Sequence, residues 1–183
     1  MSSEIIEGDH EEIRQLLVDI CPMYEDVEIP EYSHIGDSGM DLHTYFTQTF
    51  IDECIDNPSF DLLNASTEPN MCTISLKAGC RGLISTGIKI EIPFGYEIQV
   101  RSRSGLALNH GIIILNSPGT IDSTYRGEIG LIMLNTSNED FSINHCDRLA
   151  QLVLAKVEMC RWVEVDELSD TKRGIGGYGH TGI

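Results

Sequence analysis

Short β-rich runs dominate the second half of the chain. In residues 88–92 isoleucine alternates with charged residues, and residues 96–101 alternate in the same way. This alternation is typical of half-buried antiparallel strands, with one face on the core and one in solvent. Three denser apolar runs, at 112–115, 129–134 and 149–157, predict strands covered on both faces or buried between subunits. Because no long helical pattern separates these runs, the sequence predicts an all-β fold, a distorted jelly roll or β-barrel.

The apolar residues between positions 9 and 20 follow a different spacing, i, i+3, i+4 and i+7, as on one face of a helix. Asp9 is a suitable N-cap for such a helix. Cys21 ends the pattern, since the residue before Pro22 avoids the α region. We therefore predict a short N-terminal helix beside the β fold. Its apolar positions are Ile13, Leu16, Leu17 and Ile20.

The chain divides into three predicted parts. Residues 1–30 form an acidic extension with the short helix, residues 31–168 the β core, and residues 169–183 a glycine-rich arm that is mobile when empty. Residues 45–70 are predicted as a loop inserted in the core, of which 49–56 could form one or two helical turns. The extension and the insertion could be solvated decoration, or could dock a partner or cover the outside of an oligomer.

The length of 183 residues suits one domain that needs neither disulfides nor a structural metal. The six cysteines are scattered and never form a C-x-x-C pair, so we expect reduced packing residues. No apolar run reaches the ~18 residues of a membrane span. The N-terminus also lacks the basic and apolar regions of a secretory signal. These features predict an intracellular protein without a membrane partner.

The formal net charge of −17 is unevenly distributed. Residues 1–70 carry 17 acidic residues and one basic residue, whereas residues 71–183 carry 12 acidic and 11 basic ones. The acidity therefore belongs to the N-terminal part, and the rest of the chain can still bind an anion. Direct binding of nucleic acid by the whole surface is disfavoured.

Candidate chemistry begins after the second alternating run. Arg103, Ser104 and Gly105 offer a guanidinium fork, a hydroxyl and an unhindered backbone N–H within three residues, as a phosphate chain requires. The alternative is an ordinary strand end with an exposed arginine. A tight turn then leads to Asp122, with Tyr125 three residues later. The alternative there is a hairpin whose aspartate caps the turn, but folding alone does not require this combination of groups.

Five segments resemble, in order, the five motifs of the trimeric dUTP pyrophosphatase (dUTPase) family. Any single motif would be only suggestive, whereas five in family order argue against a chance match. The segments are 39–42 (GMDL), 103–107 (RSGLA), 116–127 (NSPGTIDSTYRG), 147–152 (DRLAQL) and 173–182 (RGIGGYGHTG).

The resemblance implies Mg-dependent hydrolysis of dUTP to dUMP and pyrophosphate. This reaction limits uracil incorporation into DNA and supplies dUMP for thymidylate synthesis. Asp122 would be the general base that directs a water molecule at the α-phosphorus. Mg²⁺ would bridge the triphosphate oxygens and make pyrophosphate a better leaving group. Asp41 would hold the ion indirectly, through its water shell.

The resemblance also implies which residues contact the substrate. Ser104 would bond the region where charge develops, and Arg103 and Gln151 would support the phosphates. Main-chain amides of the 112–121 hairpin would read uracil, with Tyr125 against the sugar. The implied substrate-binding residues are Arg103, Ser104, Gly105, Asn116, Gly119, Thr120, Ile121, Asp122, Tyr125, Gly130, Gln151, Arg173, Tyr178, Gly179, His180 and Thr181.

The glycine-rich tail is implied to close over the site. Its backbone N–H groups would wrap the phosphates, Arg173 would bind the γ-phosphate, and Tyr178 would stack on the base. In the family this arm reaches a neighbouring subunit, so the resemblance implies a homotrimer with shared active sites. His180 stands where serine is common, which predicts a pH-dependent closure of the arm. The other departures from the family pattern are Ser102 for proline, Cys146 for glycine and Tyr178 for phenylalanine.

Three alternatives remain at this point. A dCTP deaminase has a related fold, but it calls for a glutamate in the strand after the third motif, where this chain has Ile132 and Met133. A non-enzymatic regulator could keep the fold as an interaction module. Within the fourth motif, Asp147 and Arg148 could form a structural salt bridge that orients the strand.

Overall fold

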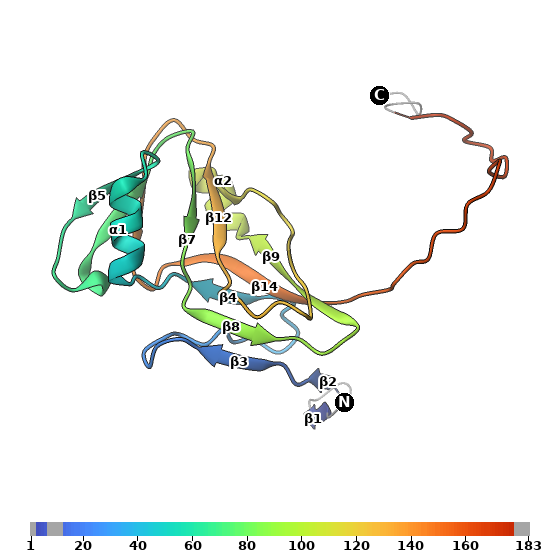
Figure 1. The fold of residues 1–183 in the computed structure, drawn as a ribbon, viewed down its shortest axis with the longest axis horizontal. Helices are drawn as coiled ribbons and strands as arrows, with labels where there is room; N and C mark the ends of the chain where they lie inside the picture. The colour runs from blue at the N-terminus through green and yellow to red at the C-terminus, as the bar shows by residue number, and fades with distance from the viewer. Residues whose placement is uncertain (1–2, 7–12, 178–183) are drawn as a thin grey trace.

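The structure is a computed structural model that describes residues 3–6 and 13–177 (Figure 1). The body consists of antiparallel strands with two α-helices and one 3-10 turn. The elements are β1 (Ser3–Ile6), β2 (Ile13–Leu16), β3 (Asp19–Pro22), β4 (Met40–His43), α1 (Gln48–Asp56), β5 (Phe60–Asn64), η1 (Pro69–Met71), β6 (Thr73–Leu76), β7 (Arg81–Ile84), β8 (Ile88–Glu91), β9 (Tyr96–Ser102), α2 (Ser104–His110), β10 (Ile112–Ile114), β11 (Gly119–Ile121), β12 (Leu131–Asn135), β13 (Phe141–Asn144) and β14 (Arg148–Lys156).

The strands form several small sheets packed around one core. The largest has the order β11-β9-β14-β4, and beside it lie the sheets β10-β12-β7 and β13-β6-β5. Two further pairs, β3-β8 and β1-β2, complete the described strands. The connections repeatedly pair strands far apart in sequence, as in a jelly roll. This arrangement confirms the predicted jelly-roll-like all-β fold.

The predicted alternation decides which side chains enter the core. In β8, Ile88 and Ile90 are buried while Glu91 is exposed, and in β9, Ile98 and Val100 are buried. The three denser runs form β10, β12 and β14, as predicted. Their inward side chains meet those of β4, β6 and β7 in one hydrophobic cluster.

The predicted N-terminal helix is wrong wherever the structure describes it. Residues 13–16 pair with β1, and residues 19–22 pair with β8, so that Ile20 lies opposite Ile90. From Leu16 to Ile20 burial alternates residue by residue, and Leu17, expected on the apolar helix face, is 45% exposed. The same apolar spacing contains a strand alternation, and pairing with an available sheet edge outweighs local helix propensity. Residues 9–12 of the predicted helix lie outside the described residues.

The insertion at 45–70 is an integral part of the core. The expected helical turns form α1, which begins where the Thr47 hydroxyl accepts a hydrogen bond from the Phe50 amide at 3.1 Å. One face of α1 is buried through Phe50, Ile51 and Cys54, and β5 adds a strand to β6. Of the two interpretations left open, solvated decoration is therefore wrong for this segment. The division at residues 30 and 168 stays a prediction.

The cysteines are only partly as predicted. All six are free thiols, which agrees with the expected reduced state. Cys54 and Cys72 are buried and pack in the core. Three cysteines are exposed, so the expectation of packing residues is wrong for them. They lie at a sheet edge, in a turn and in the C-terminal segment. These are Cys21, Cys146 and Cys160.

A close approach at Gly82 makes the docking of the insertion testable. A Cβ built on Gly82 would overlap the ring of Phe60, which lies directly on this glycine. We expect Gly82→Ala to lower the free energy of unfolding by about 1–3 kcal/mol, because overpacking displaces the buried ring. Urea unfolding measures this change. In Gly82→Ala/Phe60→Leu the smaller side chain leaves room, so the double variant should lose less than the sum of the two single variants; additive losses would contradict the contact.

Candidate active site

The second motif lies where β9 ends and α2 begins. Arg103 is the N-cap residue of α2 and has an extended backbone, so Ser104 and Gly105 open the helix. The helix ends at Gly111, whose left-handed φ of 68° lets its amide bond the Ala107 carbonyl. The chain then enters β10. This strand-helix-strand passage holds the motif at one end of the largest sheet.

Sheet register brings the first and fourth motifs to the same end. Gln151 of β14 pairs with Asp41 of β4 on one side and with Arg101 of β9 on the other. Its side-chain amide donates to the Ser102 carbonyl at 3.0 Å. A Cβ on Gly39 would lie 2.5 Å from the Gln151 side-chain oxygen, so a larger residue there would displace the Gln151 amide.

Two arginines converge on one carboxylate in this region. Arg103 Nε lies 3.0 Å from one oxygen of Asp41, and Arg148 Nη1 lies 3.3 Å from the other. Arg103 Nη1 also donates to the Arg148 carbonyl at 2.6 Å. The Arg103 and Asp41 side chains are 28% and 27% exposed, so the pair is partly shielded from water. Asp41 therefore fixes the orientation of the Arg103 guanidinium.

The salt bridge suggested between Asp147 and Arg148 does not form. Asp147 instead accepts a hydrogen bond from the Asn144 amide at 2.7 Å and closes the turn before β14. Arg148 pairs with Asp41 across the sheet. Asp147 is engaged in the turn before β14 while Arg148 opens the strand, which separates the two side chains.

A cavity of about 350 Å³ opens over this cluster. Five predicted site residues line it, from three motifs: Asp41, Arg103, Ser104, Gly105 and Gln151. Asn109 and His110 also line the cavity, and sequence analysis did not select them. The sequence feature that could have identified them is their position at the end of α2, a short helix that begins at Ser104.

The third motif runs along β9 in the same sheet, from Gly119 opposite Val100 to Ile121 opposite Ile98, so that Asp122 lies toward the start of β9. Asp122 follows the last residue of β11 and is exposed, and its carbonyl accepts from the Tyr125 amide at 3.0 Å. Tyr125 donates its hydroxyl to the Glu128 carbonyl at 2.9 Å. In the hairpin, Gly119 is buried against Val100, while the other predicted contacts of this turn reach the surface. Those residues are Asn116, Thr120 and Ile121.

One chain does not bring Asp122 to the phosphate-side cluster. Ile121, the residue before Asp122, pairs with Ile98 near the start of β9, whereas Arg103 follows the end of that strand. Five residues of extended chain separate these positions, about 17 Å at roughly 3.3 Å per residue. The candidate site is therefore divided between two ends of the sheet.

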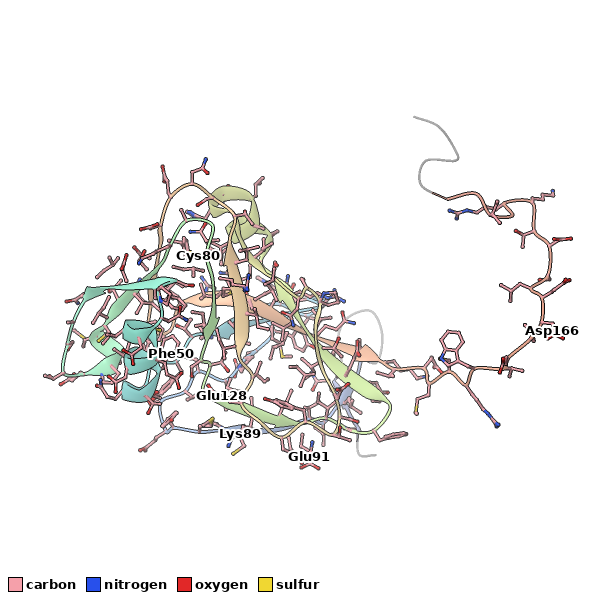
Figure 2. All side chains as sticks on the ribbon, turned by 45° about the horizontal axis from the view of Figure 1, so that its top comes forward. Phe50, Cys80, Lys89, Glu91, Glu128 and Asp166 are labelled. Carbon is pink, nitrogen blue, oxygen red and sulfur yellow. The ribbon has the colours of Figure 1, made fainter. Side chains whose placement is uncertain are left out.

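A second cavity of about 380 Å³ lies on the third-motif side. We call it the α1 groove; α1 contributes Thr49, Phe50 and Glu53 to it. From the third-motif region come Tyr125, Glu128 and Gly130. Figure 2 shows Phe50 and Glu128 on the same side of the body, beside β7.

The arm leaves the body. After β14 the chain runs away from the sheets in both views, and Asp166 marks this segment in Figure 2. Arg173 is exposed, and its Nε bonds the Gly176 carbonyl at 2.9 Å. The remaining predicted arm contacts, and with them the predicted pH-dependent closure, lie outside the described residues. They are Tyr178, Gly179, His180 and Thr181.

The residues fit an indirect role for a metal ion. Over residues 3–6 and 13–177 no group of three or more His, Cys, Asp or Glu side chains could hold a metal. One arginine contacts each oxygen of Asp41. The remaining lone pairs of these oxygens can accept hydrogen bonds from the water shell of an ion. Mg²⁺ commonly keeps several waters and takes its other ligands from substrate phosphates.

Two histidines beside the fourth motif are held neutral. His145 Nδ1 accepts the Phe46 amide at 2.9 Å, which links the start of the insertion to the turn before β14. His43 Nδ1 is buried and has no hydrogen-bond partner within the described residues. Burial lowers the pKa of both imidazoles below the ordinary value of 6.5.

These features define a class of protein: an all-β fold with a cavity whose wall presents a fixed arginine, a hydroxyl and an exposed glycine backbone. A family model for dUTPase matches residues 68–182. The chain belongs to the dUTPase family. Within the described residues, no helix is long and apolar enough to cross a membrane.

Curated relatives support this assignment. The deoxyuridine 5'-triphosphate nucleotidohydrolase of Fusobacterium nucleatum is 44% identical over 158 residues, which covers 86% of this chain and 92% of the relative. The enzyme of the same name from Nautilia profundicola is 57% identical over 109 residues, covering 60% of this chain and 77% of the relative.

Solved structures show the same fold. A mutant dUTPase of staphylococcal bacteriophage 80alpha with dUpNHpp has a TM-score of 0.70 at 21% identity, covering 92% of this chain and 100% of the phage chain. A mutant dUTPase of phage phi11, whose structure reveals the coordination of a structural Mg(II) ion, has a TM-score of 0.64 at 20% identity, covering 85% and 100%. At these identities the likeness concerns the fold alone.

The lowered pKa values of His43 and His145 predict a pH-dependent stability. The unfolded state binds protons at pH values where the folded state does not, so stability is fully present above about pH 6.5 and falls as the pH drops below it. Urea unfolding from pH 7.5 to 5.5 measures this loss. His145→Asn keeps an acceptor for the Phe46 amide but does not titrate, so the loss should become smaller; an unchanged profile would exclude His145 as a source.

Proposed function

We propose that this protein hydrolyses dUTP to dUMP and pyrophosphate, and so limits uracil incorporation into DNA and supplies dUMP for thymidylate synthesis. The observation that carries this proposal is the cavity in which three family motifs meet, with Arg103, Ser104 and Gln151 on its wall. The curated relatives named as dUTP nucleotidohydrolases support it. We place the protein inside the cell, where deoxynucleoside triphosphates are made and used.

The cavity over Arg103 is proposed to bind the triphosphate. Asp41 and the Arg148 carbonyl hold two nitrogens of the guanidinium, which orients the fork before substrate arrives. The Ser104 hydroxyl and the Gly105 amide supply short hydrogen bonds to phosphate oxygens. Gln151, fixed by its bond to Ser102, supports the same group. These donors stabilise the negative charge that develops on the leaving pyrophosphate.

Asp122 is proposed as the general base. Its exposed carboxylate accepts a proton from a water molecule as the oxygen attacks the α-phosphorus and the bond to the bridging oxygen breaks. When bound to the triphosphate, Mg²⁺ supplies charge neutralisation and in-line orientation. Asp41, which holds Arg103, would also hold that ion through its water shell.

The nucleoside is proposed to lie against the third motif. Main-chain groups of the hairpin at Gly119, Thr120 and Ile121, together with Asn116, read the carbonyl and N–H pattern of uracil. The Tyr125 ring packs against the deoxyribose and leaves no room for a 2′-hydroxyl. Gly130 lies in the same groove as Tyr125, with the Leu83 side chain packed against its backbone.

The division of the site supports a homotrimer with shared active sites. Arg103 lies about 17 Å along β9 from Ile98, the partner of the residue before Asp122, so a second copy is needed to bring Asp122 and Arg103 together. The outer face of the sheet β10-β12-β7 is apolar, with Leu83 61% and Ile132 38% exposed, and suits contact with other copies. The arm with Arg173 extends far enough from the body to reach a neighbour (Figure 1).

The two rival functions have less support. The position expected to carry a deaminase glutamate holds Ile132 and Met133, and Met133 is fully buried. A purely regulatory trimer would not require the arginine–aspartate cluster that orients Arg103 in an open cavity.

The general base is testable by a conservative change. We expect Asp122→Asn to lower kcat for dUTP by about 10²–10⁴-fold, because the amide cannot take a proton, with a smaller effect on KM. Pyrophosphate release with Mg²⁺ measures the rate, and deamination is followed separately. Asp56→Asn, an exposed carboxylate at the end of α1, is the matched control and should keep full activity. Equal kcat for native protein and Asp122→Asn would end the assignment.

The shared site is testable by mixing two inactive chains. We co-express Asp122→Asn and Arg103→Gln under different tags and purify the mixed oligomer. If each site takes Asp122 and Arg103 from different copies, roughly one site in three of every mixed trimer regains both groups and activity returns. If both groups acted within one chain, every site would carry a defect and the mixture would stay inactive.

A further inference from the structure

The Glu128 carboxylate ties the third-motif loop to the turn between β7 and β8. Its Oε1 accepts three hydrogen bonds from that turn (Figure 2). The donors are the Ser85 hydroxyl at 2.5 Å, the Thr86 amide at 3.0 Å and the Gly87 amide at 2.8 Å. Hydrogen bonds to an ionised acceptor are about twice as strong as those between neutral groups. One side chain thus joins the loop to a turn 41 residues away in the sequence.

We propose that Glu128 is a positioning residue that sets the place of Tyr125, and thereby the preference for deoxyribose over ribose. Tyr125 donates its hydroxyl to the Glu128 carbonyl at 2.9 Å, so the ring is bonded to the residue whose side chain forms the tie. The inference rests on the proposed function, because it takes Tyr125 as the contact of the sugar. The effect of Glu128 on the substrate passes through this ring.

The turn that receives the carboxylate is itself fixed to the body. The Tyr45 amide donates to the Ser85 carbonyl at 2.9 Å. The Met23 amide donates to the Gly87 carbonyl at 2.8 Å. Gly87 has a left-handed φ of 68°, and a Cβ there would lie 2.9 Å from the Val27 side chain, so the turn is packed as well as bonded. Successive amides in such a turn form a concave pair of donors that suits a carboxylate.

The residue after Glu128 is held at the same turn by backbone groups. The Ile129 amide donates to the Ile88 carbonyl at 2.9 Å, and the Thr86 hydroxyl donates to the Ile129 carbonyl at 2.5 Å. Ile129 and Thr86 are buried, which strengthens these bonds. They keep β12 in place when the carboxylate is removed. The carboxylate adds a further point that fixes the direction of the Glu128 carbonyl, which is the acceptor for Tyr125.

The other charged contact of the loop is weaker. Arg126 pairs with Glu91 of β8 at 2.8 Å, but the two side chains are 49% and 60% exposed. Exposed ion pairs contribute little to stability. Arg126 also donates to the Ser123 and Tyr125 carbonyls, which belong to its own loop. Of the two charged contacts, Glu128 is therefore the firmer tie to the body, and Glu91 is a matched carboxylate for comparison.

The position of Tyr125 matters because its selection of the sugar is steric. The side chain is partly exposed, so it is open to a ligand. A Cβ built on Gly127 would overlap the Tyr125 hydroxyl, so this group lies directly against the backbone of its own loop. A close-packed wall rejects one additional hydroxyl only while it cannot relax away from the ligand. A looser loop therefore admits ribose.

The test compares dUTP with UTP, which carries the additional 2′-hydroxyl. The ratio of kcat/KM for dUTP to that for UTP is measured for the native protein, Glu128→Ala, Glu128→Gln and Glu91→Gln. We expect Glu128→Ala to lower this ratio about tenfold, and Glu128→Gln, which keeps an acceptor oxygen, to lower it about threefold. Glu91→Gln should leave it unchanged. A general loss of structure would lower both kcat/KM values and leave their ratio as it is.

A double variant tests whether Glu128 acts through Tyr125. Tyr125→Phe removes the hydroxyl that bonds the Glu128 carbonyl. In that background Glu128→Gln should change the ratio by a smaller factor than it does in the native protein. Thermal unfolding checks the fold of each variant, and Glu128→Gln carries the test if Glu128→Ala does not fold. An unchanged ratio in Glu128→Gln, or an equal effect of this substitution in both backgrounds, would overturn the positioning role.

Binding of imido analogues of dUTP and UTP separates this inference from the proposed function. If native protein binds the dUTP analogue but does not hydrolyse dUTP, the proposed function fails, and the ratio of the two Kd values in Glu128→Gln still decides the role of Glu128. Hydrolysis of dUTP with an unchanged ratio in the variant overturns the positioning role alone. Absence of any binding to native protein overturns both.

Discussion

The pairing of β14 with its two neighbours is the constraint on which the site depends. Gln151 has Asp41 on one side and Arg101 on the other, so the first and fourth motifs lie in adjacent strands and the second motif follows directly at the end of β9. A shift of one residue in this register would turn Gln151 to the opposite face of the sheet. The buried alternation along β9 and β14, with Val100 and Leu152 directly opposite each other in the core, prevents that shift.

Local charge resolves the conflict between a strongly acidic chain and an anionic substrate. The Arg103 guanidinium is held by Asp41, so the acid nearest the phosphate cavity is neutralised by arginines on both of its oxygens. The unpaired Glu53 carboxylate lies instead in the α1 groove, away from the phosphate cavity. Electrostatics of this kind orient a ligand whatever the net charge of the protein.

The insertion is tied to the sheet by packing. Its side chains fill the core, and Phe60 lies on Gly82 of β7. Once this contact holds the insertion against the sheet, the exposed side of α1 must border the third-motif region. Packing alone thus places Glu53 in the same groove as Tyr125, and no sequence motif predicts this.

The sequence by itself determined the β fold, the order of the motifs and the residue types at the phosphate cavity, because alternation and short motifs are local properties that survive in a linear reading. It predicted a helix over 9–20 because its apolar spacing suits both a helix and a strand, and only the free edge of β8 decided between them. It likewise offered Asp147 as the partner of Arg148, whereas Asp147 closes the turn before β14 and Arg148 pairs with Asp41 of β4. Only the tertiary structure decided which residues share a cavity, and that Asp122 and Arg103 lie apart in one chain. Both facts depend on pairing between strands that are far apart in the sequence.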